Sequence, residues 1–239
     1  LCFSFFIIVM LILQQNIIHH QNIKDITIIS ILYLVGNLVY EGFYARHNKF
    51  DQIDIPMVIY CRWGTGDIWS FVSDEKYFLP MIKIASLGYA VFSSNRMWPK
   101  NYTDATKDEV WWHDLLSIYA FPDIAKNFPN IKQHKIALIG ASSGGMTVYQ
   151  ALRDMDSTIL GCAVVISWVA NMRRSHELRP ELRELHKSFF QLTDENYYSR
   201  SVTGYFEKLP KNVPMLLLHG MKDKSVLVQD SLDVASLYA

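Results

Sequence analysis

One stretch of this chain, residues 135–149 (KIALIGASSGGMTVY), constrains its fold more than any other. Residues 136–139 form an apolar run with the length of a buried strand, and residues 146–152 have the composition of a helix start. Between them Gly140, Ser142 and Gly144 follow the pattern G-x-S-x-G, which places a serine on a sharp strand-to-helix turn. Glycine has no Cβ, so it fits where the turn brings the backbone close to itself. The stretch therefore predicts a nucleophile elbow.

The elbow gives each of its residues an expected role. Ser142 is the predicted nucleophile, and Gly145 extends the small-residue pattern into the helix. The helix directs its N-terminus at Ser142, where negative charge would develop, and the N–H of Ser143 is the first predicted oxyanion donor. A phosphate loop would have a lysine after its glycines, and a dinucleotide loop would read G-x-G-x-x-G. Neither pattern is present, although a glycine-rich turn without chemistry stays open as the alternative.

Composition and charge limit the possible partners. The chain has 239 residues, half of them apolar, which is enough for one sizeable domain with a real core. The 23 basic residues balance the 23 acidic ones, so nucleic acid is not an expected partner. Cys2, Cys61 and Cys162 are widely spaced and form no metal-binding pattern. We therefore predict no metal and no cofactor, and we expect Cys61 and Cys162 to be buried free thiols.

The first residues have the composition of a leader. Residues 1–13 are almost wholly apolar, and polarity returns at residues 14–16. This run is short for a membrane span and fits the apolar region of a signal peptide. We predict that residues 1–22 are an export signal, for a periplasmic or secreted protein, or an N-terminal membrane anchor. The membrane would then be a partner only through this segment, if it stays uncleaved. A truncated start is the alternative.

The rest of the chain, residues 23–239, alternates strands with helices. Residues 26–34 and 38–45 flank a Gly-Asn pair, which predicts an antiparallel hairpin. The later elements are predicted as strands at 57–61, 89–93, 136–139, 160–168 and 213–218 and as helices at 78–86, 108–127, 146–152 and 229–238. This order indicates a mostly parallel sheet with helices on both faces, the plan of an α/β-hydrolase fold. A charged segment at about 171–210 is predicted to be a lid-like insertion. The last predicted helix runs to the end, so we expect the C-terminal part of the domain to be missing.

A serine nucleophile needs a base and an acid that orients the base, and in this fold the chain order is serine, acid, histidine. Asp223 follows the strand predicted at 213–218 and is the expected acid, with a simple turn aspartate as the alternative. His219 precedes the acid and is expected to be structural. No histidine follows Asp223, which indicates either a truncated chain or a relative without the triad. His113 and His176 would be rival bases only with an unusual chain order.

Two segments together carry a family resemblance. Residues 140–146 (GASSGGM) and residues 214–226, with the pattern H-G-x-x-D-x-x-V, resemble the catalytic domain of prolyl-oligopeptidase-like serine peptidases, the S9 group. The resemblance implies a Ser-Asp-His hydrolase that attacks peptide or ester bonds of a small-molecule or peptide substrate. Ser142 matches its nucleophile and Asp223 its acid, while its histidine has no counterpart. The loop after residue 61 is bulkier than usual, which leaves Trp63 or Gly64 as the second oxyanion donor. We select Gly64.

These observations give two expected functions. The first is a serine hydrolase that forms an acyl-enzyme on Ser142. The second is a catalytically inactive α/β-hydrolase-like binding protein, or a truncated gene product, because the triad histidine is absent.

Overall fold

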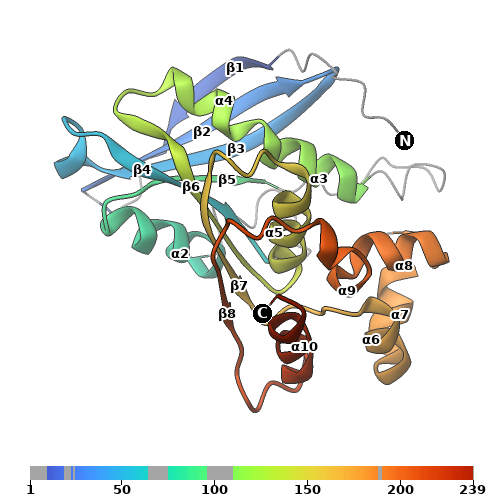
Figure 1. Ribbon diagram of the computed structural model, residues 1–239. Coiled ribbons are helices and arrows are strands. Elements are labelled where there is room, and N and C mark those ends of the chain that lie inside the picture. Colours follow the sequence, from blue (N-terminus) through green and yellow to red (C-terminus); the bar gives the residue numbers. More distant parts are fainter. Residues whose placement is uncertain are drawn as a thin grey trace.

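The computed structural model describes residues 10–18, 23, 25–63, 75–95, 110–187 and 190–238 (Figure 1). These residues form one eight-stranded sheet with the order β1-β2-β3-β5-β4-β6-β7-β8. The strands are β1 (Met10–Ile17), β2 (Ile26–Val35), β3 (Leu38–His47), β4 (Ile55–Cys61), β5 (Ala90–Ser94), β6 (Ile131–Ala141), β7 (Leu160–Ile166) and β8 (Met215–Leu218). Pairs from β1 to β5 are antiparallel, and those joining β5, β4, β6, β7 and β8 are parallel. The predicted α/β-hydrolase fold class is confirmed.

The N-terminal hairpin forms where the sequence predicts it. Strands β2 and β3 pair along their whole length, from Ile26 opposite His47 to Val35 opposite Leu38. The turn between them has Gly36 at φ +62°, a conformation that a side chain would strain. Strand β1 adds to the outer edge of β2, so residues 10–17 of the predicted leader belong to the sheet. The leader function itself stays a prediction. Among the described residues no helix is long and apolar enough to cross a membrane.

Helices cover both faces of the sheet (Figure 1). On one face Met81 of α2 (Glu75–Ser86) shares a buried cluster with Val58 of β4 and Val91 of β5. On the other face α5 (Ser143–Asp154) places Val148 in a larger core with Leu138 of β6. Burial of these apolar side chains on both faces explains why the interior strands read as continuous apolar runs.

The helix predicted over 108–127 is divided. It forms α3 (Val110–Tyr119), α4 (Phe121–Ile124) and the 3-10 helix η3 (Ala125–Asn127). Pro122 lies in the first turn of α4, where its missing N–H leaves no helical hydrogen bond unmade. The sequence analysis treated these helices as one.

The segment between β7 and β8 is helical. It contains α6 (Met172–Leu178), α7 (Pro180–Lys187), α8 (Asp194–Arg200), α9 (Val202–Tyr205) and the 3-10 helix η4 (Phe206–Lys208). The chain then passes through β8 to α10 (Val228–Tyr238). Figure 1 shows α6, α7 and α8 gathered beyond α9 at one side of the sheet. This is the segment that the sequence predicted as a lid-like insertion, and its role as a lid stays a prediction.

Candidate active site

The carboxyl ends of β4, β6, β7 and β8 lie next to one another. In the register of the sheet Cys61 pairs with Gly140, Ala141 with Ile166, and Ile166 with Leu218. The residues that follow these strands therefore meet at one edge of the sheet, which is where open α/β sheets bind their ligands. Ser142 follows β6, and Asp223 lies in the loop that follows β8.

Ser142 has an unusual backbone conformation. Its φ of +49° and ψ of −128° lie in a region that residues with a Cβ rarely adopt. Its N–H donates to the carbonyl of Ile166 (N···O 2.9 Å), and its carbonyl accepts from the N–H of Gly145 (2.7 Å). The side chain is exposed and makes no hydrogen bond to cap the helix. A strained turn thus presents the hydroxyl outward at the start of α5, which is the conformation of a nucleophile elbow.

The three glycines of the turn lie where no side chain would fit. A Cβ on Gly140 would be 2.2 Å from the carbonyl oxygen of Gly144, and one on Gly144 would be 2.0 Å from that of Cys61. A Cβ on Gly145 would be 2.7 Å from the Cβ of Trp168. The first two contacts involve backbone atoms, which cannot rotate away. The turn is therefore held by close packing of α5 against the ends of β4, β6 and β7.

The predicted oxyanion donors lie on two segments. Ser143 is the first residue of α5, so its N–H belongs to the first turn of the helix, where N–H groups favour negative charge. Gly64, the second predicted donor, lies outside the described residues. Its neighbour Trp63 packs edge-on against Tyr60, with the ring centroids 6.3 Å apart.

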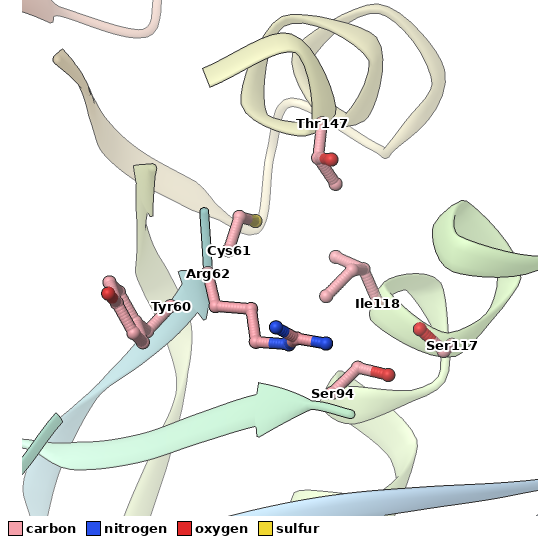
Figure 2. A pocket seen from close by; sticks show the side chains of 7 residues that line it. All are labelled: Tyr60, Cys61, Arg62, Ser94, Ser117, Ile118 and Thr147. Carbon is pink, nitrogen blue, oxygen red and sulfur yellow. The ribbon is translucent and has the colours of Figure 1, made fainter. Parts of the chain in front are cut away.

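A small cavity lies beneath the turn, and Figure 2 shows it from close by. It is lined by Tyr60, Cys61, Arg62, Ser94, Ser117, Ile118 and Thr147. The Arg62 side chain is 2 % exposed and extends towards Ser94 at the end of β5 and Ser117 on α3 (Figure 2). The cavity holds about 10 Å³, the room for one water molecule. It is too small for a substrate.

The Asp223 carboxylate is held mainly by its own loop. Its Oδ1 accepts from the N–H groups of Ser225 (2.8 Å) and Val226 (3.0 Å). The backbone N–H of Ser167, the residue after β7, donates to the carbonyl of Leu218 (2.9 Å), the residue before His219. The Val226 and Ser225 amides and nearby His219 lower the pKa of the Asp223 carboxyl below its usual range. Asp223 is therefore a carboxylate at neutral pH.

His219 has the structural role that the sequence predicts. Its Nε2 lies 2.9 Å from the carbonyl oxygen of Val226, which can only accept, so Nε2 carries the proton. Its Nδ1 then accepts from the hydroxyl of Ser231 (2.7 Å). The side chain is 4 % exposed, and Nε2 is 3.6 Å from Oδ2 of Asp223. The ring joins the acid loop to α10.

His176, one of the two rival bases, is bonded inside the helical segment. Its Nδ1 is 3.0 Å from the hydroxyl of Tyr197, and its Nε2 is 2.7 Å from Nδ1 of His186. The pKa of His176 and that of His186 are both lowered to about 4, mainly by burial, with a smaller contribution from Arg183 at His176 and from His176 at His186. Both rings are neutral at pH 7 and engaged with each other. The side chain of His113, the other rival, lies outside the described residues.

The cysteines partly match the prediction. Cys61 is buried and Cys162 is half-buried, and both are free thiols. Burial raises the pKa of the Cys162 thiol. Cys2 lies outside the described residues. Within the described part of the chain no group of three His, Cys, Asp or Glu side chains could hold a metal ion.

Fold and turn together define the class of this protein. The sheet is mostly parallel and has helices on both faces, and strand β6 leads through a serine with positive φ into a helix. This arrangement defines the α/β-hydrolase fold. The family model described as the prolyl oligopeptidase family, peptidase family S9, matches residues 84–237. The chain therefore belongs to the prolyl oligopeptidase family.

The chain is also similar to individual proteins, and the solved structures among them share its fold. The chain is 26% identical over 214 residues to the "Uncharacterized peptidase YtmA" of Bacillus subtilis (strain 168), covering 87% of this chain and 78% of the relative. An acylaminoacyl peptidase from Pyrococcus horikoshii has a TM-score of 0.74 and 18% identity over 90% of this chain. An acetyl xylan esterase from Paenibacillus sp. R4 has a TM-score of 0.60 and 15% identity, covering 96% of this chain and 87% of the esterase. The chain spans 35% of the length of the acylaminoacyl peptidase.

Sequence reasoning did not single out Ser167 or Arg62. Ser167 lies inside the strand predicted at 160–168 but follows β7 in the structure, and only the pairing of β7 with β8 brings its N–H to the carbonyl of Leu218. Arg62 was part of the predicted loop after β4, and nothing in its local sequence indicates burial beneath the turn.

Proposed function

We propose that this chain is a serine hydrolase that cleaves peptide or ester bonds through an acyl-enzyme on Ser142. The observation that carries the proposal is the turn itself. An exposed serine in left-handed backbone, enclosed by glycines that tolerate no Cβ, stands at the carboxyl end of an interior strand and at the start of a helix. Strain of this kind persists at functional sites, and a turn that only connects two elements does not require it.

The chemistry follows from the positions of the groups. The Ser142 Oγ attacks the carbonyl carbon of the substrate, and a general base accepts the hydroxyl proton. The N–H of Ser143 donates to the oxygen on which negative charge develops. The leaving amine or alcohol takes the proton from the base, and water then hydrolyses the acyl-enzyme. Asp223 accepts the N–H of the base and holds it in the required tautomer.

The substrate class is a peptide or a small ester. Membership in a peptidase family favours peptide bonds. The fold is shared with acylaminoacyl and prolyl oligopeptidases and also with acetyl xylan esterases, as those structures are described. Because the site uses the same groups for both reactions, we propose acyl transfer from an amide or an ester.

A second candidate function rests on one observation. Among the described residues, His176 and His219 have both ring nitrogens bonded to other groups. Without a base the hydroxyl of Ser142 stays a weak nucleophile, and the domain would then bind a ligand or partner without cleaving it.

Labelling by a fluorophosphonate probe tests both candidates. We expect the probe to label the protein and Ser142→Ala to abolish labelling, while Ser236→Ala, at an exposed serine on α10, keeps the wild-type rate. Labelling that survives Ser142→Ala would place the nucleophile elsewhere. A folded wild-type protein that is never labelled, and that hydrolyses neither acyl-peptide anilides nor p-nitrophenyl acetate, would favour the binding protein.

A further inference from the structure

The loop that carries the proposed acid is shaped by hydrogen bonds more than by burial. We call residues 220–226 the acid loop; most of them are exposed, so apolar packing contributes little to its shape. Within the loop Oδ1 of Asp223 accepts from the N–H groups of Ser225 (2.8 Å) and Val226 (3.0 Å). The direction of the carboxylate therefore follows the peptide groups that bind it.

The peptide group between Ser225 and Val226 is bonded on both sides. Its N–H is that of Val226 and donates to Asp223. Its carbonyl is that of Ser225 and accepts from the guanidinium of Arg179. Because a peptide group is planar, one rigid unit separates the guanidinium from the carboxylate. A cation at the carbonyl also polarises the peptide group, which makes its N–H a stronger donor to the carboxylate.

Arg179 comes from a different part of the chain. It follows α6 in the helical segment between β7 and β8, and its backbone N–H donates to the carbonyl of Ser175 in that helix (2.9 Å). Its Nε donates to the carboxylate of Glu181 (2.8 Å), while Nη1 donates to Ser225. The planar guanidinium is held at two points, so it presents a fixed donor to the acid loop.

A second side chain holds the other end of the acid loop. The carbonyl of Val226 accepts from Nε2 of the His219 ring (2.9 Å), and Nδ1 of that ring binds Ser231 of α10 (2.7 Å). This contact lies between the neighbouring elements β8 and α10. The contact with Arg179 instead connects the acid loop to a segment that is not part of the sheet.

We propose that Arg179 is a positioning residue for the proposed reaction. Through the peptide group between Ser225 and Val226 it holds the Asp223 carboxylate in the orientation that accepts the N–H of the catalytic base. The helical segment then supplies a part of the site itself. This role rests on the proposed function of Ser142 and Asp223, and it is tested separately from that function.

Three variants isolate the Arg179 donor. Arg179→Ala removes it, and Arg179→Lys keeps the charge and a donor without the planar fork. Arg183→Ala is the matched control, because Arg183 is an exposed arginine of α7 that pairs with Glu184 (3.6 Å). All three variants should keep the wild-type unfolding midpoint in urea, since none removes a buried apolar group.

Two measurements compare the variants with wild type. The first follows the Asp223 carboxyl by ¹³C NMR through an acid titration, which needs no catalysis. Its apparent pKa should rise in Arg179→Ala, rise less in Arg179→Lys and stay unchanged in Arg183→Ala. The second is the pH dependence of fluorophosphonate labelling. We expect Arg179→Ala to be labelled about fivefold more slowly, with a shifted acid limb, because its effect passes through a peptide group and a direct hydrogen bond to a charged group supplies roughly tenfold. Arg179→Lys should recover part of the rate.

Each outcome decides a different statement. If wild type is not labelled at Ser142, the proposed function fails, and the titration alone decides whether Arg179 holds the carboxylate. If wild type is labelled and folded Arg179→Ala has the same rate and pH profile, Arg179 has no positioning role. An unchanged titration of Asp223 in Arg179→Ala would exclude the connection through the peptide group in solution. Labelling of Arg183→Ala as slow as that of Arg179→Ala would assign the effect to the charge of the helical segment and overturn the proposal.

Discussion

The turn around Ser142 and the region from Ser167 to α10 are held by different forces. Close contacts between backbone atoms fix the turn, where two glycines leave no room for a methyl group. Polar side chains fix the second region: His176 bonds His186, Arg174 pairs with Asp230 at 2.8 Å, and Asp223 binds its own loop. Packing does not depend on pH, whereas contacts between titratable groups do. The proposed nucleophile and its acid should therefore respond to different perturbations.

The largest effect should come from adding one methyl group to the turn. Gly144→Ala would put a Cβ 2.0 Å from the Cys61 carbonyl oxygen, a backbone atom that cannot move without displacing β4. We expect a loss of about 5 kcal/mol of folding stability, or failure to fold, because overpacking here has no side chain to relax. Urea unfolding followed by circular dichroism measures this loss of folding stability.

Gly220→Ala is the matched control for that substitution. A Cβ on Gly220 meets no atom within 4 Å, so its unfolding midpoint should stay near the wild-type value. A Gly144→Ala protein as stable as Gly220→Ala would show that the turn is not held by packing.

The second-largest effect should be a loss of folding stability when the pH is lowered. The pKa of each buried histidine of the His176–His186 pair is about 4 in the folded protein, against about 6.5 in an unfolded chain. Because the folded-state pKa is depressed, the contribution of each neutral imidazole to folding stability is fully present above pH 6.5. This contribution is lost as the pH falls towards 4. For one such site the loss is about 2 kcal/mol between pH 7 and pH 5, above the range in which most carboxylates titrate.

Urea unfolding at pH 7 and pH 5 measures this difference. His186→Gln, which cannot titrate, should show a smaller decrease than wild type. His134→Gln replaces an exposed histidine on β6 and should keep the wild-type decrease. An identical decrease in His186→Gln and wild type would assign the acid sensitivity to other groups.

The smallest effect should come from relieving strain in the turn. Ser142→Gly and Ser142→Ala both lose the hydroxyl, but glycine adopts positive φ without a Cβ clash. We expect the glycine variant to be more stable than the alanine variant by about 1 kcal/mol. The same pair at Ser236, inside helix α10, should show the opposite order, since glycine weakens a helix. Equal stability of the two Ser142 variants would mean that the turn stores no strain.

The same contrast explains what the sequence could predict. The elbow is local: a short apolar run, three glycines and a helix start identify it without knowledge of any partner strand. The hairpin and the parallel strands likewise follow from apolar runs and turn residues. Strand β1 was not predicted, because its identity depends on pairing with β2, and its apolar residues suggested a leader. Ser167 was not identified because its bond to Leu218 exists only after β7 pairs with β8. Contacts that depend on strand order leave no pattern in the local sequence.

The peptide unit between Ile166 and Ser167 also bears on how this protein can change over generations. It joins the nucleophile turn to the acid strand through main-chain atoms that are the same whichever side chain residue 166 carries. Selection on substrate or temperature could thus replace Ile166 freely among residues that suit a strand without altering how Ser142 is set relative to β8. The alignment of the two proposed catalytic segments is inherited with the backbone, and the surrounding side chains are left free to diverge.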